Sequence, residues 1–269
     1  MIILPSNKPI IKYPYSRDLP TLFIVNANAQ IMWNFSPYSC KNSGSIITTN
    51  NTSVTSWDSI GALTESMPST GTTNPIWYNN RPEFNNKPAV YFNGSTDVLD
   101  ITSSVLNSGT PIGANGVAIG MTFSLPSKPA SSSLIFEYGA PTFPNTQYYR
   151  IAATDTAISH VTANGSSVNA FSSYNINTSY SSFMANRNYI VTAYYINQAV
   201  VSPNLPFSYA GNNTNRYYPR IRIAPKTPVY ISHIVVYKYG GSTNSAVTLS
   251  AAQYAPWYSY FKGLYGSVN

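Results

Sequence analysis

Charged residues are scarce in this sequence. Asp, Glu, Lys and Arg make up 9% of the 269 residues, far below the roughly 25% that is usual in globular proteins. Long amphipathic helices are rich in Glu, Lys, Arg and Ala, so this scarcity argues against a helical fold. Tyr (23 residues), Pro (20 residues), Asn, Ser and Thr take the place of the charged residues. Short runs of Tyr, Thr, Ile and Val between turn residues are typical of strands, and the composition therefore predicts an all-β chain.

Cysteine and long apolar runs are also lacking. Cys40 is the only cysteine, which excludes an internal disulfide framework and a cluster of thiolates around a metal. The sequence has no apolar run of the roughly 18 residues that a membrane span needs. Pro5 interrupts the apolar start too early for a signal peptide. We therefore expect synthesis in a host cytoplasm without secretion, and no insertion into a membrane.

Acidic residues are fewer than basic ones, 8 against 15, which gives a net charge of +7. The basic residues are scattered, and the densest group consists of Arg216, Arg220, Arg222 and Lys226. In a strand-like stretch these charges are expected to alternate between faces, so they form no stripe for a nucleic acid, and we expect no such partner. Two interpretations stay open: a solvated edge that lacks acidic partners, or a weak attraction to an anionic surface.

Residues 1–20 differ from the rest because proline recurs in them every four to six residues. Proline removes a backbone donor and holds the chain extended, so this segment predicts an extended N-terminal arm. Three basic residues lie between the prolines and are candidates for assembly contacts: Lys8, Lys12 and Arg17. The arm either wraps its own domain or docks on a neighbouring subunit, and a homo-oligomer is one possible outcome.

Residues 21–269 show no break in composition and predict one β-sandwich domain. Seven segments have strong strand patterns: 89–92, 117–125, 134–138, 148–152, 189–196, 219–223 and 229–237. In 117–125, apolar residues alternate with small ones, and Asn164-Gly165 predicts a tight hairpin. A short C-terminal helix is expected because Tyr254, Trp257, Tyr258 and Phe261 share one helical face, with Gly263 as its C-terminal cap.

Separated stretches of the sequence, in the right order, resemble one family. They are Val54-Thr55-Ser56-Trp57-Asp58, Asn74-Pro75-Ile76-Trp77, the block from Asn86-Lys87-Pro88-Ala89-Val90 to Leu99, Ile231 to Tyr237, and Leu249-Ser250 with the helix that ends at Gly266. The chain resembles the concanavalin A-like (laminin-G-like) jelly-roll domains of bacteriophage structural proteins and bacterial surface proteins. The resemblance covers about residues 31–266, and the block at 86–99 is its most specific part.

Physical reasons support the resemblance. Trp57 and Phe92 are large enough to fill the space between two sheets about 10 Å apart. Asn93-Gly94 predicts a tight turn in which glycine permits a positive φ. The family includes lectins, glycosidases and scaffolds, so the resemblance predicts the fold more firmly than the function.

Catalytic patterns are lacking. The acidic residues show no Glu-x-Asp-x-x-Glu spacing, and Glu137, although on a strand, has no second acid near it in the sequence. A pair of carboxylates brought together from distant segments stays open as an alternative. His233 lies in a strand pattern and is expected to be a structural, hydrogen-bonded histidine. We therefore expect a protein that is not an enzyme.

Two kinds of binding residue are candidates. Asp97 and Asp100, close to the turn at Asn93-Gly94, offer oxygen ligands for calcium, although a polar turn without metal is the simpler explanation; no other cofactor is expected. Adjacent tyrosines on a strand point to opposite faces, so one of each pair is expected outside the core. This pattern selects Tyr149, Tyr195, Tyr217 and Tyr218 as candidates for contact with a glycan or another protein.

The leading hypothesis from the sequence is a non-enzymatic virion structural protein of a bacteriophage, an accessory capsid, fibre or tail component. It would be exposed on the particle, attached through the N-terminal arm, and partnered by other virion proteins. The alternative is a lectin-like module that binds host-surface glycan during adsorption. A glycan-degrading enzyme is a third hypothesis.

Overall fold

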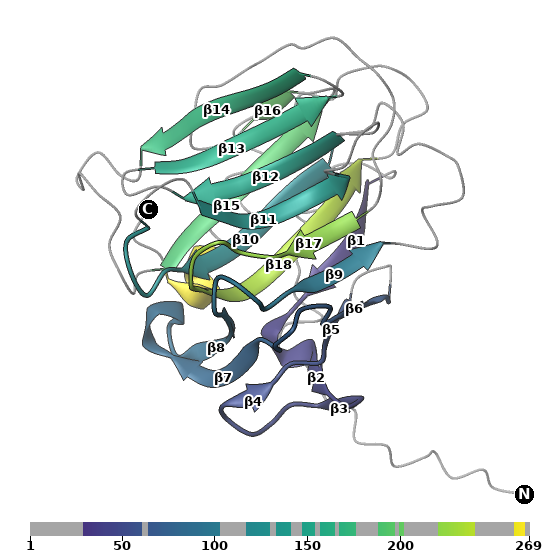
Figure 1. The fold of residues 1–269 in the computed structure, drawn as a ribbon, viewed down its shortest axis with the longest axis vertical. Coiled ribbons are helices and arrows are strands. Elements are labelled where there is room, and N and C mark those ends of the chain that lie inside the picture. The colour runs from purple at the N-terminus through teal and green to yellow at the C-terminus, as the bar shows by residue number, and fades with distance from the viewer. Residues whose placement is uncertain are drawn as a thin grey trace, which may run out of the picture.

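The fold of this chain is a β-sandwich of antiparallel strands (Figure 1). The structure is a computed structural model that describes residues 29–60, 64–102, 117–129, 133–140, 147–153, 157–164, 167–175, 188–196, 199–201, 220–239 and 261–266. Within them, strands dominate and one short α-helix lies near the C-terminus, which confirms the all-β prediction. The predicted arm, with Lys8, Lys12 and Arg17, lies outside the described residues. No helix in the described part of the chain has the length and apolarity needed to cross a membrane.

The larger sheet has eight strands and is organised around β18. Its members are β1 (Ala29–Phe35), β4 (Thr52–Ser53), β7 (Ile76–Arg81), β8 (Lys87–Phe92), β10 (Val117–Ser124), β15 (Asn188–Ile196), β16 (Ala199–Val201) and β18 (Val229–Tyr239). The order is β16-β15-β10-β18-β8-β7-β4, and β1 also pairs with β18. Because β10 pairs along most of β18, β8 and β1 share the other side of this strand.

The second sheet has six strands and packs in front of the first in Figure 1. Its members are β9 (Leu99–Thr102), β11 (Ser133–Ala140), β12 (Gln147–Ala153), β13 (Ala157–Asn164), β14 (Ser167–Asn175) and β17 (Arg220–Ile223). The order is β14-β13-β12-β11-β17-β9. Asn164 pairs with Ser167, so two residues connect β13 to β14, which confirms the predicted hairpin.

A small four-stranded sheet lies at one end of the sandwich (Figure 1). It contains β2 (Cys40–Asn42), β3 (Ser45–Ile46), β5 (Ser56–Asp58) and β6 (Ser66–Pro68). Two short 3-10 helices connect strands in this region: η2 (Pro37–Ser39) lies between β1 and β2, and η3 (Pro82–Phe84) lies between β7 and β8. The seven strands predicted from the sequence are all present, whereas most of the short strands of this end were not predicted.

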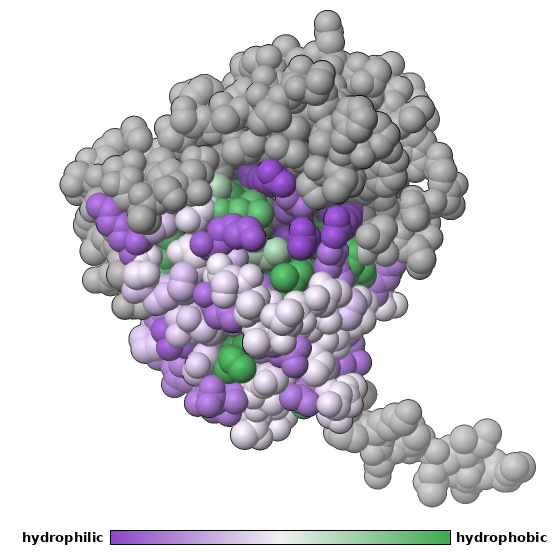
Figure 2. Space-filling model, viewed as in Figure 1, coloured by the Kyte–Doolittle hydropathy of each residue, from purple (hydrophilic) through white to green (hydrophobic). Residues whose placement is uncertain are grey.

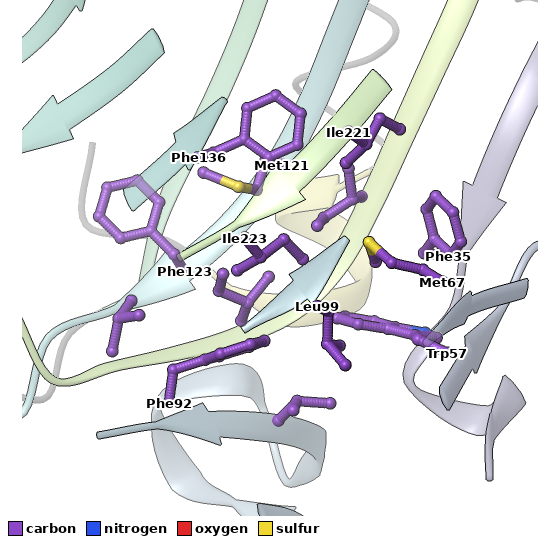
Figure 3. Close-up of a cluster of buried hydrophobic side chains, with 14 of the residues drawn as sticks. Phe35, Trp57, Met67, Phe92, Leu99, Met121, Phe123, Phe136, Ile221 and Ile223 are labelled. Carbon is purple, nitrogen blue, oxygen red and sulfur yellow. The ribbon is translucent and has the colours of Figure 1, made fainter. Parts of the chain in front are cut away.

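Large side chains from the two main sheets and from the small sheet meet in one core (Figure 3). Trp57 and Phe92 are fully buried, as predicted, and the Trp57 indole N–H donates to the Ser36 carbonyl at 2.6 Å. The alternation predicted for 117–125 places Met121 and Phe123 in this core. Burial of such side chains supplies most of the stabilisation of the fold, at about 25 cal/mol per Å² of apolar surface.

Gly94 follows β8 in the left-handed region, with φ +80°, as the turn prediction requires. The space around it is also full: a Cβ built on Gly94 would lie 2.4 Å from the Thr227 carbonyl carbon. Both backbone geometry and close packing therefore demand glycine at this turn.

The C-terminal helix is described over residues 261–265. Phe261 and Tyr265 pack on Phe84, Ala89 and Val235, on the outer face of the eight-stranded sheet. The prediction of Gly263 as the cap was wrong, because Gly263 lies inside the helix. Gly266, with φ +67°, ends the helix by donating its N–H to the Lys262 carbonyl at 2.9 Å. The helix continues past Gly263 because both aromatic residues, one turn apart, contact the sheet.

His233 connects this helix to the sheet. Its Nδ1 lies 2.9 Å from the Tyr265 hydroxyl, and its Nε2 lies 2.6 Å from the Asn34 side-chain oxygen. The amide oxygen can only accept, so Nε2 donates to it and Nδ1 accepts from Tyr265. Burial lowers the pKa of His233 from 6.5 to about 3. The neutral imidazole thus joins β18, β1 and the helix, in agreement with the structural role expected for this histidine.

Stability should therefore fall as the pH decreases below about 6.5. In that range an unfolded His233 takes up a proton and the folded one does not, so the unfolded state gains about 1.4 kcal/mol per pH unit until the folded pKa is reached. Urea unfolding between pH 7 and 5, where carboxylates remain ionised, measures this slope. His233→Gln should be less stable at pH 7 but should lose the part of the slope that His233 contributes. An unchanged slope in His233→Gln would contradict this account.

Candidate functional site

A row of charged side chains crosses the outer face of the six-stranded sheet. In β17, Ile221 and Ile223 point into the core, so Arg220 and Arg222 point outward. Arg222 lies opposite Asp100 of β9 on one side and opposite Glu137 of β11 on the other. Glu137 in turn lies opposite Arg150 of β12. We call Asp100, Arg220, Arg222, Glu137 and Arg150 the charged row, and Figure 2 shows strongly hydrophilic side chains on this face.

Ion pairs hold most of the charged row together. Arg150 Nε donates to Glu137 Oε2 at 2.5 Å. Arg220 binds Asp100 with two nitrogens, Nε to Oδ1 at 2.8 Å and Nη2 to Oδ2. The hydrogen bond to Asp100 raises the pKa of Arg220 although burial opposes it. Arg222 contacts Asp100 only at 3.7 Å, through Nε.

These contacts correct one interpretation of the sequence. The basic group around Arg220 was considered a solvated edge without acidic partners, but β17 lies between β11 and β9. Arg220 is paired with Asp100, which is 120 residues away in the sequence. Arg220 and Arg222, two residues apart on a strand, share the outward face opposite the buried isoleucines of β17, so the expectation that these charges alternate between faces was wrong. The sequence could not reveal this pairing because it depends on strand order.

Three tyrosines form a second cluster, on the outer face of the eight-stranded sheet. Tyr78 follows buried Trp77 in β7, Tyr91 lies between buried Val90 and Phe92 in β8, and Tyr230 lies between buried Val229 and Ile231 in β18. Strand alternation directs all three outward, and each is half-buried. We call Tyr78, Tyr91 and Tyr230 the tyrosine cluster.

The rings of the tyrosine cluster contact one another and one arginine. Tyr91 and Tyr230 are directly opposite, with ring centroids 4.8 Å apart, and Tyr78 packs edge-on against Tyr230 at 5.8 Å. The guanidinium carbon of Arg81 lies 3.9 Å from the Tyr230 centroid, a cation–π contact. Glu83 fixes this guanidinium by accepting from Nε at 3.0 Å and from Nη2 at 2.7 Å.

The hydroxyl groups of Tyr91 and Tyr230 stay protonated at neutral pH. Burial raises the pKa of Tyr91, with further contributions from Tyr78 and Asp97. Burial also raises the pKa of Tyr230, although Arg81 acts in the opposite direction. These two phenols therefore keep both a donor and an acceptor beside an apolar ring, a combination that suits sugars and polar protein surfaces.

The predicted tyrosines are a different set. Tyr149 lies in β12 and Tyr195 in β15, but their side chains are outside the described residues, as are Tyr217 and Tyr218. The tyrosine cluster was missed because adjacent Tyr pairs were used as the signal. A tyrosine that alternates with large apolar residues, as in Val90-Tyr91-Phe92, is the signal that would have found it.

Asp97 and Asp100, the calcium candidates, contact different partners. Asp97 is buried and accepts from the Asn93 backbone N–H at 2.8 Å and from the Thr73 hydroxyl. Asp100 is bound by Arg220 in the charged row. Each carboxylate thus has donors from the protein, and the described part of the chain shows no group of three or more His, Cys, Asp or Glu placed to hold a metal. The calcium hypothesis stays a prediction.

Comparison with known proteins identifies the fold. No family model matches the sequence, and no curated protein matches it. The receptor-binding domain of botulinum neurotoxin D has a similar structure, with TM-score 0.57 and 7% identity over 87% of this chain and 52% of that chain. The receptor-binding domain of the C/D mosaic serotype matches with TM-score 0.53 and 9% identity over 87% of this chain and 51% of that chain.

A third similar structure is described as "Cell entry of botulinum neurotoxin type C is dependent upon interaction with two ganglioside molecules". It matches with TM-score 0.53 and 10% identity over 86% of this chain and 51% of that chain. The chain thus spans about half the length of these three structures. At such identities the likeness shows a shared β-sandwich fold, in agreement with the jelly-roll expectation.

Removal of divalent cations tests whether Asp97 is a calcium ligand or only part of a polar turn without metal. Because its oxygens accept from Asn93 and Thr73, we expect EDTA to leave the melting temperature unchanged. Asp97→Ala should cost about 1–3 kcal/mol of stability, since it leaves two donors without an acceptor. Asp58→Ala, which removes an ion pair with Lys41 and the hydrogen bond from the exposed Ser66 hydroxyl, is the control and should cost at most about 1 kcal/mol because water replaces both contacts. A melting temperature that falls with EDTA and recovers with Ca²⁺ would establish a calcium site instead.

Proposed function

We propose that this chain is a non-enzymatic, glycan-binding β-sandwich whose sugar-contacting surface is the tyrosine cluster. The observation that carries the proposal is the grouping of three half-buried tyrosines with Arg81 on one outer face. Sugar rings have an apolar face that packs on aromatic rings, while their hydroxyls need donors and acceptors at the edge. Tyr78, Tyr91 and Tyr230 supply the rings, and their hydroxyls with the Arg81 guanidinium supply the polar partners.

Preorganisation supports binding at this surface. The rings contact one another, and Arg81 is held by Glu83, whose side chain is only 4% exposed. Side chains that are already ordered lose little conformational freedom when a ligand binds. The ganglioside interaction named for one structure of similar fold supports the choice of oligosaccharides as ligands.

The contacts of the acids favour binding over hydrolysis. A glycosidase needs one carboxylic acid that can protonate the leaving oxygen and a second carboxylate across the sugar. Glu137 and Asp100 share one face, but each is engaged by an arginine at short distance. Their surroundings therefore do not provide the free acid that the reaction requires.

The biological setting that we propose is a bacteriophage particle. This part rests on the sequence resemblance to jelly-roll domains of phage structural proteins and on the proline-rich, basic segment 1–20. In this setting the sandwich faces outward, contacts host-surface glycan, and is attached to other virion proteins through the arm.

Binding to a glycan array followed by calorimetry tests the proposed surface. Tyr91→Ala should weaken binding of the best glycan at least tenfold, corresponding to about 1.4 kcal/mol, because it removes the ring that pairs with Tyr230. Tyr91→Phe separates the hydroxyl from the ring and should cause a smaller loss. Tyr38→Ala, at a half-buried tyrosine elsewhere in the chain, should bind as the wild type does. If no glycan binds, or if Tyr38→Ala and Tyr91→Ala weaken binding equally, the proposal fails.

Deletion of residues 1–20 tests the attachment. The truncated chain should keep the melting temperature of the sandwich but should no longer be incorporated into particles, because the arm holds it there. Light scattering of both forms shows whether the arm also joins copies of the chain. The triple variant Lys8→Ser, Lys12→Ser, Arg17→Ser keeps the prolines but removes the charges. Loss of its incorporation would indicate that the arm attaches through charge, and normal incorporation would indicate that the extended shape is sufficient. Normal incorporation of the truncated chain would exclude the arm as the attachment.

A further inference from the structure

Arg222 has the weakest ion pairing in the charged row. Arg150 is paired with Glu137 at 2.5 Å, and Arg220 takes both oxygens of Asp100. The only ion-pair contact of Arg222 among the described residues is the 3.7 Å approach of its Nε to Asp100. Among the described residues the row holds three arginines and two carboxylates, and Arg222, in the middle of the row, has the longest ion-pair distance.

Glu137, directly opposite Arg222, has one carboxylate oxygen without a hydrogen-bond partner in the described part of the chain. Its side chain is 3% exposed, and Oε2 accepts from Arg150, but Oε1 is buried and has no hydrogen-bond partner in the described structure. Nε of Arg222 is likewise buried without a hydrogen bond. A buried acceptor and a buried donor that are left unpaired are each costly. Their strands are adjacent, with Glu137 and Arg222 as register partners.

We propose that the charged row binds a sugar acid, a saccharide unit that carries both a carboxylate and hydroxyl groups. A hydroxyl is the group that can donate to Glu137 Oε1 and accept from Arg222 Nε at the same time. The carboxylate pairs with the outer nitrogens of Arg222 and supplies the missing negative charge, in the forked geometry that guanidinium and carboxylate share.

The exposure of the arginines gives a ligand access to this place. The Arg222 side chain is 40% exposed, and the Arg150 side chain is 31% exposed. Arg150 lies on β12 and Arg222 on β17, the two neighbours of β11, so both long side chains reach the surface on either side of Glu137. Figure 2 shows apolar side chains exposed beside the hydrophilic ones on this face, which suits the apolar face of a sugar ring.

Simpler ligands fit less well. A small anion such as acetate or sulfate neutralises Arg222 but offers no donor to Glu137. A neutral sugar offers hydroxyls but leaves the positive charge uncompensated, and a cation is repelled by three arginines. This site is on the opposite side of the sandwich from the tyrosine cluster and does not depend on the proposed function.

Calorimetry on the full chain tests the inference, with glucuronate, glucose and acetate as probes at equal ionic strength. Glucuronate should bind at least tenfold more tightly than either glucose or acetate. Arg222→Met should weaken glucuronate binding at least tenfold, and Glu137→Gln should weaken it several-fold. Lys226→Met removes the same charge from an exposed position after β17 and should bind glucuronate as the wild type does.

The other results would overturn the inference. Absence of glucuronate binding, equal binding of acetate, or an equal loss in Lys226→Met and Arg222→Met would each do so, the last because it indicates unspecific attraction to charge. Thermal unfolding of each variant verifies the fold, and Arg222→Met, altered at a partly exposed position, remains informative if Glu137→Gln does not fold. Tyr91→Ala should leave glucuronate binding unchanged, so the two sites can fail separately.

Discussion

The packing of large side chains between the two main sheets fixes where the remaining side chains point. Phe92, Met121 and Ile221 are fully buried in this core, and their strands have a side-chain period of two. Tyr91 is outside because its neighbours Val90 and Phe92 are inside, and Arg222 is outside because Ile221 and Ile223 are inside. A shift of one residue in register would bury Arg222 and expose the isoleucines. The two candidate surfaces are thus consequences of the core.

The outer face of the eight-stranded sheet shows how a second layer of packing refines this arrangement. Phe261 and Tyr265 cover Ala89 and Val235, and Tyr230 packs against the same cluster. His233 is hydrogen-bonded to both Tyr265 and Asn34, so the covering helix is held in one place. The tyrosine cluster lies where this cover ends. Its rings are therefore supported on one side and open on the other, as a binding surface requires.

Local patterns predicted the parts of the fold that depend on neighbouring residues. The alternation in 117–125, the turn at Asn93-Gly94 and the hairpin after Asn164 were all predicted correctly. The C-terminal cap was predicted at Gly263, but two glycines follow Phe261. The helix ends at Gly266 because Tyr265 packs against the sheet, a contact that the sequence does not show. The charged row was not predictable, since Asp100 and Arg220 meet through the pairing of β9 with β17. Sequence alone does not give strand order, and so it does not give the contacts that strand order creates.

The similarity to the botulinum receptor-binding domains is carried by the core, because identities of 7–10% leave little of the surface in common. Function in such a fold depends on what the outward positions carry. Here the two outer faces differ in a way that packing does not require. Arg81 is paired with Glu83 and stacks on Tyr230, whereas among the described residues Arg222 has only the 3.7 Å contact with Asp100, and Oε1 of Glu137 has no hydrogen-bond partner. Unpaired polar groups reduce stability, and a ligand that completes them is the explanation that we propose for their place in the middle of a paired row.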